Sequence, residues 1–171
     1  STQTIRDGLD LLEDYGINTV RLRVFVNPNN HKINGHCSKE ETVAMAVRAA
    51  QRGMRVMINF HYSDSWADPG KQNKPAAWAN HSFAELKDDV FAHTQEVLNA
   101  LKAVGVTPAW VQIGNEIPGG MLWPEGRTDN FGQLAQLINA GYDATKAVDS
   151  AIRVIVHVDQ GNNNGRFRWF F

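Results

Sequence analysis

The sequence predicts an α/β fold built on a parallel sheet, and three observations support this prediction. Four short runs rich in β-branched and aromatic residues have the length of strands, at 20–26, 56–62, 109–113 and 152–158. A segment with helical periodicity precedes three of these runs. The segments that follow the runs are long, whereas those that precede them are very short. Alternating helices and strands require parallel strands joined by right-handed crossovers.

The expected helices have recognisable ends. Gly16, Gly53 and Gly105 each lie a few residues before an expected strand, where a helix commonly ends in a left-handed residue. The segments SKEE at 38–41 and SFAE at 82–85 have the capping-box pattern that opens a helix. The expected order is therefore a helix followed by a strand, four times over.

The loops after the strands decide between two kinds of parallel sheet. The segments 27–37, 63–81 and 117–129 are long and rich in glycine, proline, asparagine and aromatic residues. Long loops at one end of the sheet are typical of the functional face of a (β/α)8 barrel or of a doubly wound sheet. The first strand is followed by NPNN at 27–30 and not by a glycine-rich phosphate-binding sequence, which favours the barrel.

Four strands are only half of an eight-stranded barrel. We therefore expect residues 1–171 to form part of a single barrel domain, with no second domain. The chain stops at 166–171, soon after the last expected strand and before a helix could cover that strand. Two strand edges and much apolar surface would then be open, which favours self-association.

The composition excludes several classes of partner. Of the 171 residues, 43% are hydrophobic and 20% are charged, and the formal net charge of −1 gives no reason to expect nucleic acid or an anionic membrane. No apolar run approaches the roughly 20 residues that span a bilayer, and residues 1–7 lack the apolar core of a signal peptide. The single cysteine, Cys37, lies near His31 and His36 without the spacing of a metal site, so we expect a solvated loop and no metal or cofactor.

Polar residues gather at the carboxyl ends of the four expected strands. A polar side chain inside a barrel must be paired, so a ring of such residues indicates a functional site. In chain order the ring contains Arg21, Arg23 and Asn27, then Asn59, His61, Tyr62, Ser63, Asp64, Trp66 and Asp68, then Asn115, Glu116 and Trp123, and finally His157, Asp159 and Gln160.

Glu116 is the candidate catalytic residue. It follows directly on an expected buried strand, where loss of solvent favours the protonated carboxyl group that a general acid needs. Asn115 beside it can donate a hydrogen bond to a sugar hydroxyl. The alternative is that this pair only forms the N-cap and first-turn acid of the next helix. Trp66, Trp78 and Trp123 in the loops favour the functional interpretation, because flat aromatic rings stack on sugars.

Five segments are similar to those of a known family: VRLRVFVNP at 20–28, NFHYSDSWADPG at 59–70, PAAW at 75–78, QIGNEI at 112–117 and GMLWPEG at 120–126. Together, in order and spacing, they resemble the endo-β-1,4-galactanases of glycoside hydrolase family 53, over nearly the whole chain. The phrase HYSDxWADP is specific, whereas Asn-Glu at a strand end is shared by many retaining barrel glycosidases.

The resemblance implies a (β/α)8 barrel of which this chain supplies strands two to five. It implies endo-hydrolysis of β-1,4-galactosidic bonds in (arabino)galactan by a retaining mechanism with two carboxyl groups. Glu116 would be the acid/base, and Asn115 would bind the sugar 2-hydroxyl. The nucleophile would belong to strand seven, outside this chain, so the fragment alone should be nearly inactive. Secretion is implied by the resemblance and by the polymeric substrate.

The resemblance also implies roles for other site residues. Arg21 or Arg23 would hold the charge of the nucleophile, and strand alternation places both on one face, either toward the site or toward charges on the outer helices. The remaining substrate-binding candidates are His61, Asp64, Trp66, Trp123 and His157.

Several alternatives stay open. His61 is equally a packed barrel histidine, and Asp64 is a turn or sugar-binding residue rather than a catalytic one. An inverting pair that used Asp64, Asp68 or Asp159 would need a separation of roughly 6.5–9.5 Å, and nothing in the sequence selects one. Asn59 stands where the family usually has Asp. A related barrel hydrolase acting on another β-1,4-glycan, or a non-catalytic galactan-binding protein, would share many of these features.

Overall fold

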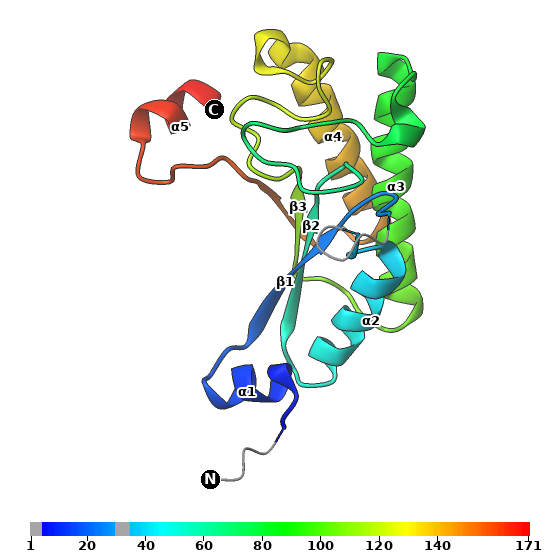
Figure 1. Ribbon diagram of the computed structural model, residues 1–171, viewed down its shortest axis with the longest axis vertical. Coiled ribbons are helices and arrows are strands. Elements are labelled where there is room, and N and C mark those ends of the chain that lie inside the picture. Colours follow the sequence, from blue (N-terminus) through cyan, green and yellow to red (C-terminus); the bar gives the residue numbers. More distant parts are fainter. Residues whose placement is uncertain (1–4, 30–34) are drawn as a thin grey trace.

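A four-stranded parallel sheet forms the centre of the protein (Figure 1). The computed structural model describes residues 5–29 and 35–171. The strands pair in sequence order and are β1 (Thr19–Val24), β2 (Arg55–Phe60), β3 (Trp110–Ile113) and β4 (Arg153–Val156). All four expected strands are confirmed, but three of them end two residues earlier than predicted. In β2 the reason is Tyr62, whose left-handed backbone (φ 48°) cannot continue a strand.

Helices alternate with the strands as expected. They are α1 (Gly8–Asp14), α2 (Lys39–Ala50), α3 (Phe83–Ala103), α4 (Phe131–Val148) and α5 (Asn164–Phe170), with short 3₁₀ turns η1 (Ala76–Trp78) and η2 (Thr128–Asn130). Figure 1 shows α2, α3 and α4 on one side of the sheet. Although no room for a covering helix was expected after β4, the short helix α5 forms there, and its Phe170 packs against Phe131 with ring centroids 5.8 Å apart.

Local sequence signals set the helix ends. Both predicted capping boxes are present, at the starts of α2 and α3, with the side chain of Ser38 accepting from the backbone of Glu41 and that of Ser82 accepting from Glu85. The predicted glycines Gly16, Gly53 and Gly105 all have positive φ, between 70° and 79°. The capping boxes satisfy backbone groups that a helix end would otherwise leave unpaired.

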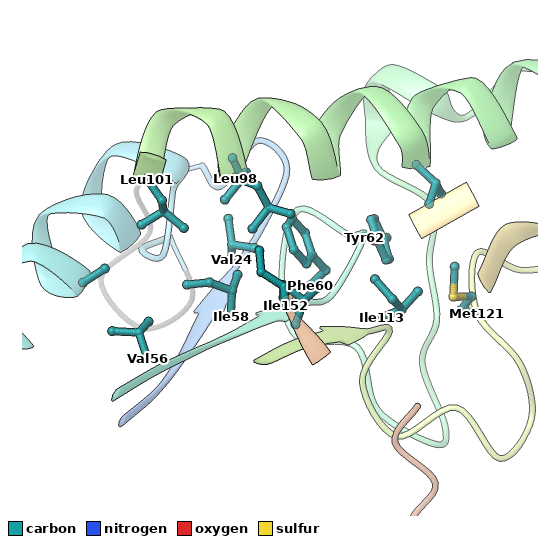
Figure 2. Close-up of a cluster of buried hydrophobic side chains, with 14 of the residues drawn as sticks. Val24, Val56, Ile58, Phe60, Tyr62, Leu98, Leu101, Ile113, Met121 and Ile152 are labelled. Carbon is teal, nitrogen blue, oxygen red and sulfur yellow. The ribbon is translucent and has the colours of Figure 1, made fainter. Parts of the chain in front are cut away.

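Strand alternation divides the sheet into an apolar face and a polar face. Ile58 and Phe60 of β2 are fully buried and point toward Leu98 and Leu101 of α3 (Figure 2). The other face carries several polar side chains, among them Arg21 and Arg23 of β1, Asn59 of β2 and Gln112 of β3. Parallel register places three of these polar residues in one row across the sheet: Arg23, Asn59 and Gln112. The core therefore fixes which side chains face the site.

Other expectations concern edges, metals and membranes. Among the described residues, β1 and β4 are the edge strands of the sheet. His31 lies outside the described residues, while His36 pairs with Glu41 at 2.8 Å and Cys37 is a free thiol. Within 5–29 and 35–171, no three His, Cys, Asp or Glu side chains gather closely enough to hold a metal ion. The same residues contain no helix long and apolar enough to cross a membrane.

Candidate active site

Asn115 is the centre of a hydrogen-bond network at the carboxyl end of β3. Its side chain is buried, and Oδ1 accepts from Arg21 Nη2 at 2.7 Å and from Asn59 Nδ2 at 3.2 Å. Its Nδ2 donates to the backbone oxygen of Ala67 at 2.8 Å. An amide nitrogen carries two hydrogens, so one remains for a ligand. The network therefore holds Asn115 in one orientation.

Glu116 lies on a tight left-handed turn directly after this network. Its backbone has φ 48°, and Gly114 two residues earlier has φ 75°. The backbone nitrogen of Glu116 donates to His157 Nδ1 at 3.3 Å, across to the residue that follows β4. The side chain is half-buried. The alternative helix-cap role of Asn115 and Glu116 is wrong, because α4 begins fifteen residues later with Asn130 as its N-cap.

The two arginines of β1 face the site, not the outer helices. The guanidinium of Arg21 also donates to Gln112 Oε1 at 3.1 Å. Burial lowers the pKa of Arg21, and the nearby Glu116 carboxylate opposes this effect. Arg23 instead lies over the ring of Trp66, with Cζ 4.0 Å from the ring centroid. Arg21 is thus the arginine next to the Asn115–Glu116 pair.

The two site histidines are held as hydrogen-bond acceptors. His61 is buried, and its Nδ1 accepts from the backbone nitrogen of Ala67 at 2.9 Å. Burial, with the positive charges of Arg21 and Arg23, lowers the pKa of His61 to about 3. Burial also lowers the pKa of His157. Both rings are therefore neutral at pH 7, which suits the packed role expected as one alternative for His61.

Asp64 joins two loops through its carboxylate. Oδ1 accepts from the backbone nitrogen of Asn27 at 2.9 Å, and Oδ2 accepts from that of Ala76 at 2.9 Å. Both oxygens are occupied by the protein's own backbone, as in the turn role that the sequence offered beside sugar binding. The other aspartates are also engaged locally: Asp68 accepts from the backbone of Gly70 at 2.8 Å, and Asp159 lies 3.3 Å from Arg166 Nε.

The three loop tryptophans differ in what they offer a ligand. Trp66 is 39% exposed, with Arg23 on one side of its ring. Trp123 is partly buried, its Nε1 donates to Gly119 O at 3.0 Å, and Arg127 lies 4.6 Å from its ring. Trp78 is only 7% exposed and packs against His93, so its expected role as a stacking surface is wrong.

Comparison with known proteins agrees with this geometry. The family model described as Glycosyl hydrolase family 53 matches residues 1–171. The chain belongs to this family. It is 37% identical to an arabinogalactan endo-β-1,4-galactanase of Thermothelomyces thermophilus, over 95% of this chain and 48% of the relative. It is also 37% identical to an endo-β-1,4-galactanase of Bacillus subtilis, over 95% of this chain and 38% of the relative.

Solved structures of family 53 confirm the fold. A catalytic domain of this family from Ignisphaera aggregans superimposes with a TM-score of 0.90 and 38% identity, over 96% of this chain and 47% of that one. A fungal β-1,4-galactanase gives a TM-score of 0.88 at 36% identity. The chain spans about half the length of the curated relatives it matches. The expected half of a (β/α)8 barrel is therefore confirmed.

Two glutamines of this family 53 site were missed by the sequence reasoning. Gln112 Nε2 donates to Asn59 Oδ1 at 2.6 Å and to the backbone oxygen of Gly114 at 2.7 Å. A polar residue alternating with apolar ones in β3 was the signal for it. Gln72 donates to backbone oxygens next to Glu116, including that of Asn115 at 2.8 Å. It lies in a long loop, where no periodicity marks it.

Proposed function

We propose that the protein carrying this chain hydrolyses β-1,4-galactosidic bonds within (arabino)galactan by a retaining mechanism, and that residues 1–171 are part of its single catalytic barrel domain. The family and the names of the galactanase relatives support the substrate. The observation that carries the proposal is the placement of Glu116. It is a half-buried residue at the end of a barrel strand, its backbone nitrogen donates to His157 Nδ1 at 3.3 Å, and the preceding Asn115 accepts from Arg21 at 2.7 Å.

Glu116 serves as the acid/base in this mechanism. Its carboxyl group protonates the oxygen of the departing sugar and, as a carboxylate, later removes a proton from the attacking water. A second carboxyl group, supplied from outside this chain at roughly 5–5.5 Å, attacks the anomeric carbon. The two carboxyl groups carry out the reaction without a cofactor.

The neighbouring residues bind the substrate and balance charge. The free amide hydrogen of Asn115 donates to a sugar hydroxyl, because Arg21, Asn59 and Ala67 hold the rest of that side chain. Arg21 is better placed than Arg23 to stabilise the charge of the nucleophile, since Arg23 lies over Trp66. The exposed ring of Trp66 and the partly buried ring of Trp123 supply stacking surfaces for galactose units.

Mutation of Glu116 in the full-length protein tests the proposal. Glu116→Gln should lower the rate of galactan hydrolysis by about 10²–10⁴-fold, the usual contribution of general acid–base catalysis. Glu13→Gln, at an exposed position on α1, is the matched control and should leave the rate unchanged. Full activity of Glu116→Gln on galactan, or faster hydrolysis of mannan, xylan or glucan by the wild type, would contradict the proposal.

Binding and truncation separate chemistry from recognition. Galactooligosaccharides should bind both the wild type and Glu116→Ala, but only the wild type should hydrolyse them. Binding without hydrolysis by the wild type would indicate a galactan-binding protein, and equal hydrolysis by the two would show that Glu116 is not the catalytic residue. The isolated 171-residue chain should be nearly inactive because the nucleophile lies outside it. Galactan hydrolysis by that chain, abolished by Glu116→Gln, would contradict this assignment.

Two further proposals concern the setting of the enzyme. We propose that it acts outside the cell, because galactan is a polymer. We also propose that copies of the 171-residue chain associate through the edge strands β1 and β4, since unpaired strand edges favour pairing. Light scattering on this chain checks the second point, and a mass of one chain at all concentrations would contradict it.

A further inference from the structure

Gln72 is a buried loop residue whose side chain contacts the turn that carries Glu116. It lies between β2 and α3 with 1% of its surface exposed. Its Nε2 donates to the backbone oxygen of Asn115 at 2.8 Å and to that of Glu116 at 3.1 Å. The same nitrogen also lies 3.0 Å from the backbone oxygen of Asp68. One amide group thus links its own loop to the end of β3.

The three backbone oxygens define how the Gln72 amide must point. Only the nitrogen can face them, because an amide oxygen in that place would meet three acceptors and no donor. The other end of the amide, Oε1, is buried and has no hydrogen-bond partner within the described part of the chain. A buried unpaired oxygen is unfavourable, and an apolar side chain would avoid it. The contacts of Nε2 are therefore the feature that a glutamine supplies at this position.

The turn needs support from outside itself. Glu116 has φ 48°, a left-handed conformation that residues other than glycine adopt at a cost. Such a conformation persists when the surroundings hold it. Gln72 binds the backbone oxygens on both sides of the Glu116 α-carbon, so it acts on the backbone that sets the direction of the Glu116 side chain.

The same segment also holds the loop that follows Glu116. The backbone oxygen of Gln72 accepts from the backbone nitrogen of Trp123 at 2.8 Å. Two residues on, Lys74 pairs with Glu125 at 2.8 Å, and both side chains are largely buried. The segment 72–74 therefore contacts both the turn at Asn115–Glu116 and the loop that follows it.

We propose that Gln72 is a positioning residue for the acid/base: its side-chain amide holds the left-handed turn so that the Glu116 carboxyl group meets the glycosidic oxygen. Gln72 itself touches no substrate. This role rests on the proposed function of Glu116. Loss of the amide leaves the galactan-binding surfaces in place and moves the proton donor.

Two variants of the full-length protein test this role. Gln72→Met keeps the length of the side chain and removes the donor, and Gln72→Glu keeps the shape and replaces the amide by a carboxyl group. Gln136→Glu, at an exposed position on α4, is the control for the added charge. The melting temperature of each variant is measured beside its kinetics, because Gln72 is buried.

The decisive readout is kcat/KM on two substrates. In galactan the leaving sugar is a poor leaving group and must be protonated as it departs. In an aryl galactobioside the dinitrophenolate is a good leaving group and departs without help from an acid. Gln72→Met should lower kcat/KM about 10–100-fold on galactan, as for a misplaced catalytic group, and less than about threefold on the aryl substrate. Gln72→Glu should lose more on galactan as the pH rises, because only the protonated carboxyl group can donate to the backbone oxygens.

A structural role would give a different result. If Gln72 only stabilised the fold, both substrates would be affected by the same factor, and this outcome would overturn the proposal. Failure of both variants to fold would also overturn it. Glu116→Gln, assayed in parallel, separates the two ideas. If it remains active on galactan, the acid/base assignment fails. If it is inactive while the Gln72 variants show no difference between substrates, only the positioning role fails.

Discussion

The buried histidine of α3 makes the stability of the protein depend on pH. His93 is 8% exposed, and burial lowers its pKa to about 4. An unfolded histidine takes up its proton near pH 6.5. Between these two values the unfolded state binds more protons than the folded state, so the free energy of unfolding falls as the pH falls through this window. From pH 7 to pH 5, His93 alone should account for a loss of about 2 kcal/mol.

Urea unfolding of the wild type and His93→Gln at pH 5, 6 and 7 measures this loss. The variant removes the titrating ring, while buried His61, which also charges only at low pH, is present in both proteins and cancels in the comparison. The difference in free energy of unfolding between wild type and variant should shift by about 2 kcal/mol, in favour of the variant, between pH 7 and pH 5. A difference that does not change with pH would refute the reasoning, since His93 would then bind protons equally in both states.

Three further substitutions test other contacts. Asn59→Asp should raise the pKa of His61 above about 3, because a carboxylate would replace the amide nitrogen that lies 3.1 Å from His61 Nε2. NMR titration of the His61 ring measures this pKa, and an unchanged value would argue against the contact. Gly120→Ala should lower the free energy of unfolding by at least about 2 kcal/mol, since φ is 95° and the new Cβ would lie 2.0 Å from a backbone oxygen. Urea unfolding measures this loss, and Gly161→Ala is the control, since a Cβ at Gly161 would meet no atom within 4 Å. Leu98→Ala, at a position 1% exposed, should cost about 2–5 kcal/mol, and a loss under about 1 kcal/mol would mean that the site collapses around the missing atoms.

Signals carried by neighbouring residues made much of the fold predictable. The capping box that begins at Ser38 and the glycine at Gly53 mark helix ends within a few residues, and both have the predicted conformation. Alternation placed Arg21 and Arg23 on one face, but it left open which face. The structure decides this because Val20, Leu22 and Val24, which alternate with the two arginines, belong to the hydrophobic core or pack against it. The placement of Glu116 at a strand end was also predictable from the sequence, because an apolar run stops just before it.

The support of the site depends on contacts between distant parts of the chain. Gln72 reaches backbone oxygens 43 and 44 residues further on, and Asp64 binds a backbone nitrogen 37 residues before it. No local pattern encodes such pairs, because they exist only once the loops are packed. Trp78 was misread for the same reason. Its loop position suggested exposure, but the helix that buries it begins several residues later.

The contacts between the two long loops bear on how barrel enzymes of this kind can be re-engineered. The loop that carries Trp66 is bonded to the loop that carries Trp123 through the backbone of Gln72 and the Lys74–Glu125 pair. A chimera that exchanged only the first loop for that of a relative would bring in a foreign partner for the second. The two loops should therefore be exchanged together. Chimeras that receive both 63–81 and 117–129 from one relative should keep activity, whereas chimeras that receive only one of these loops should lose it.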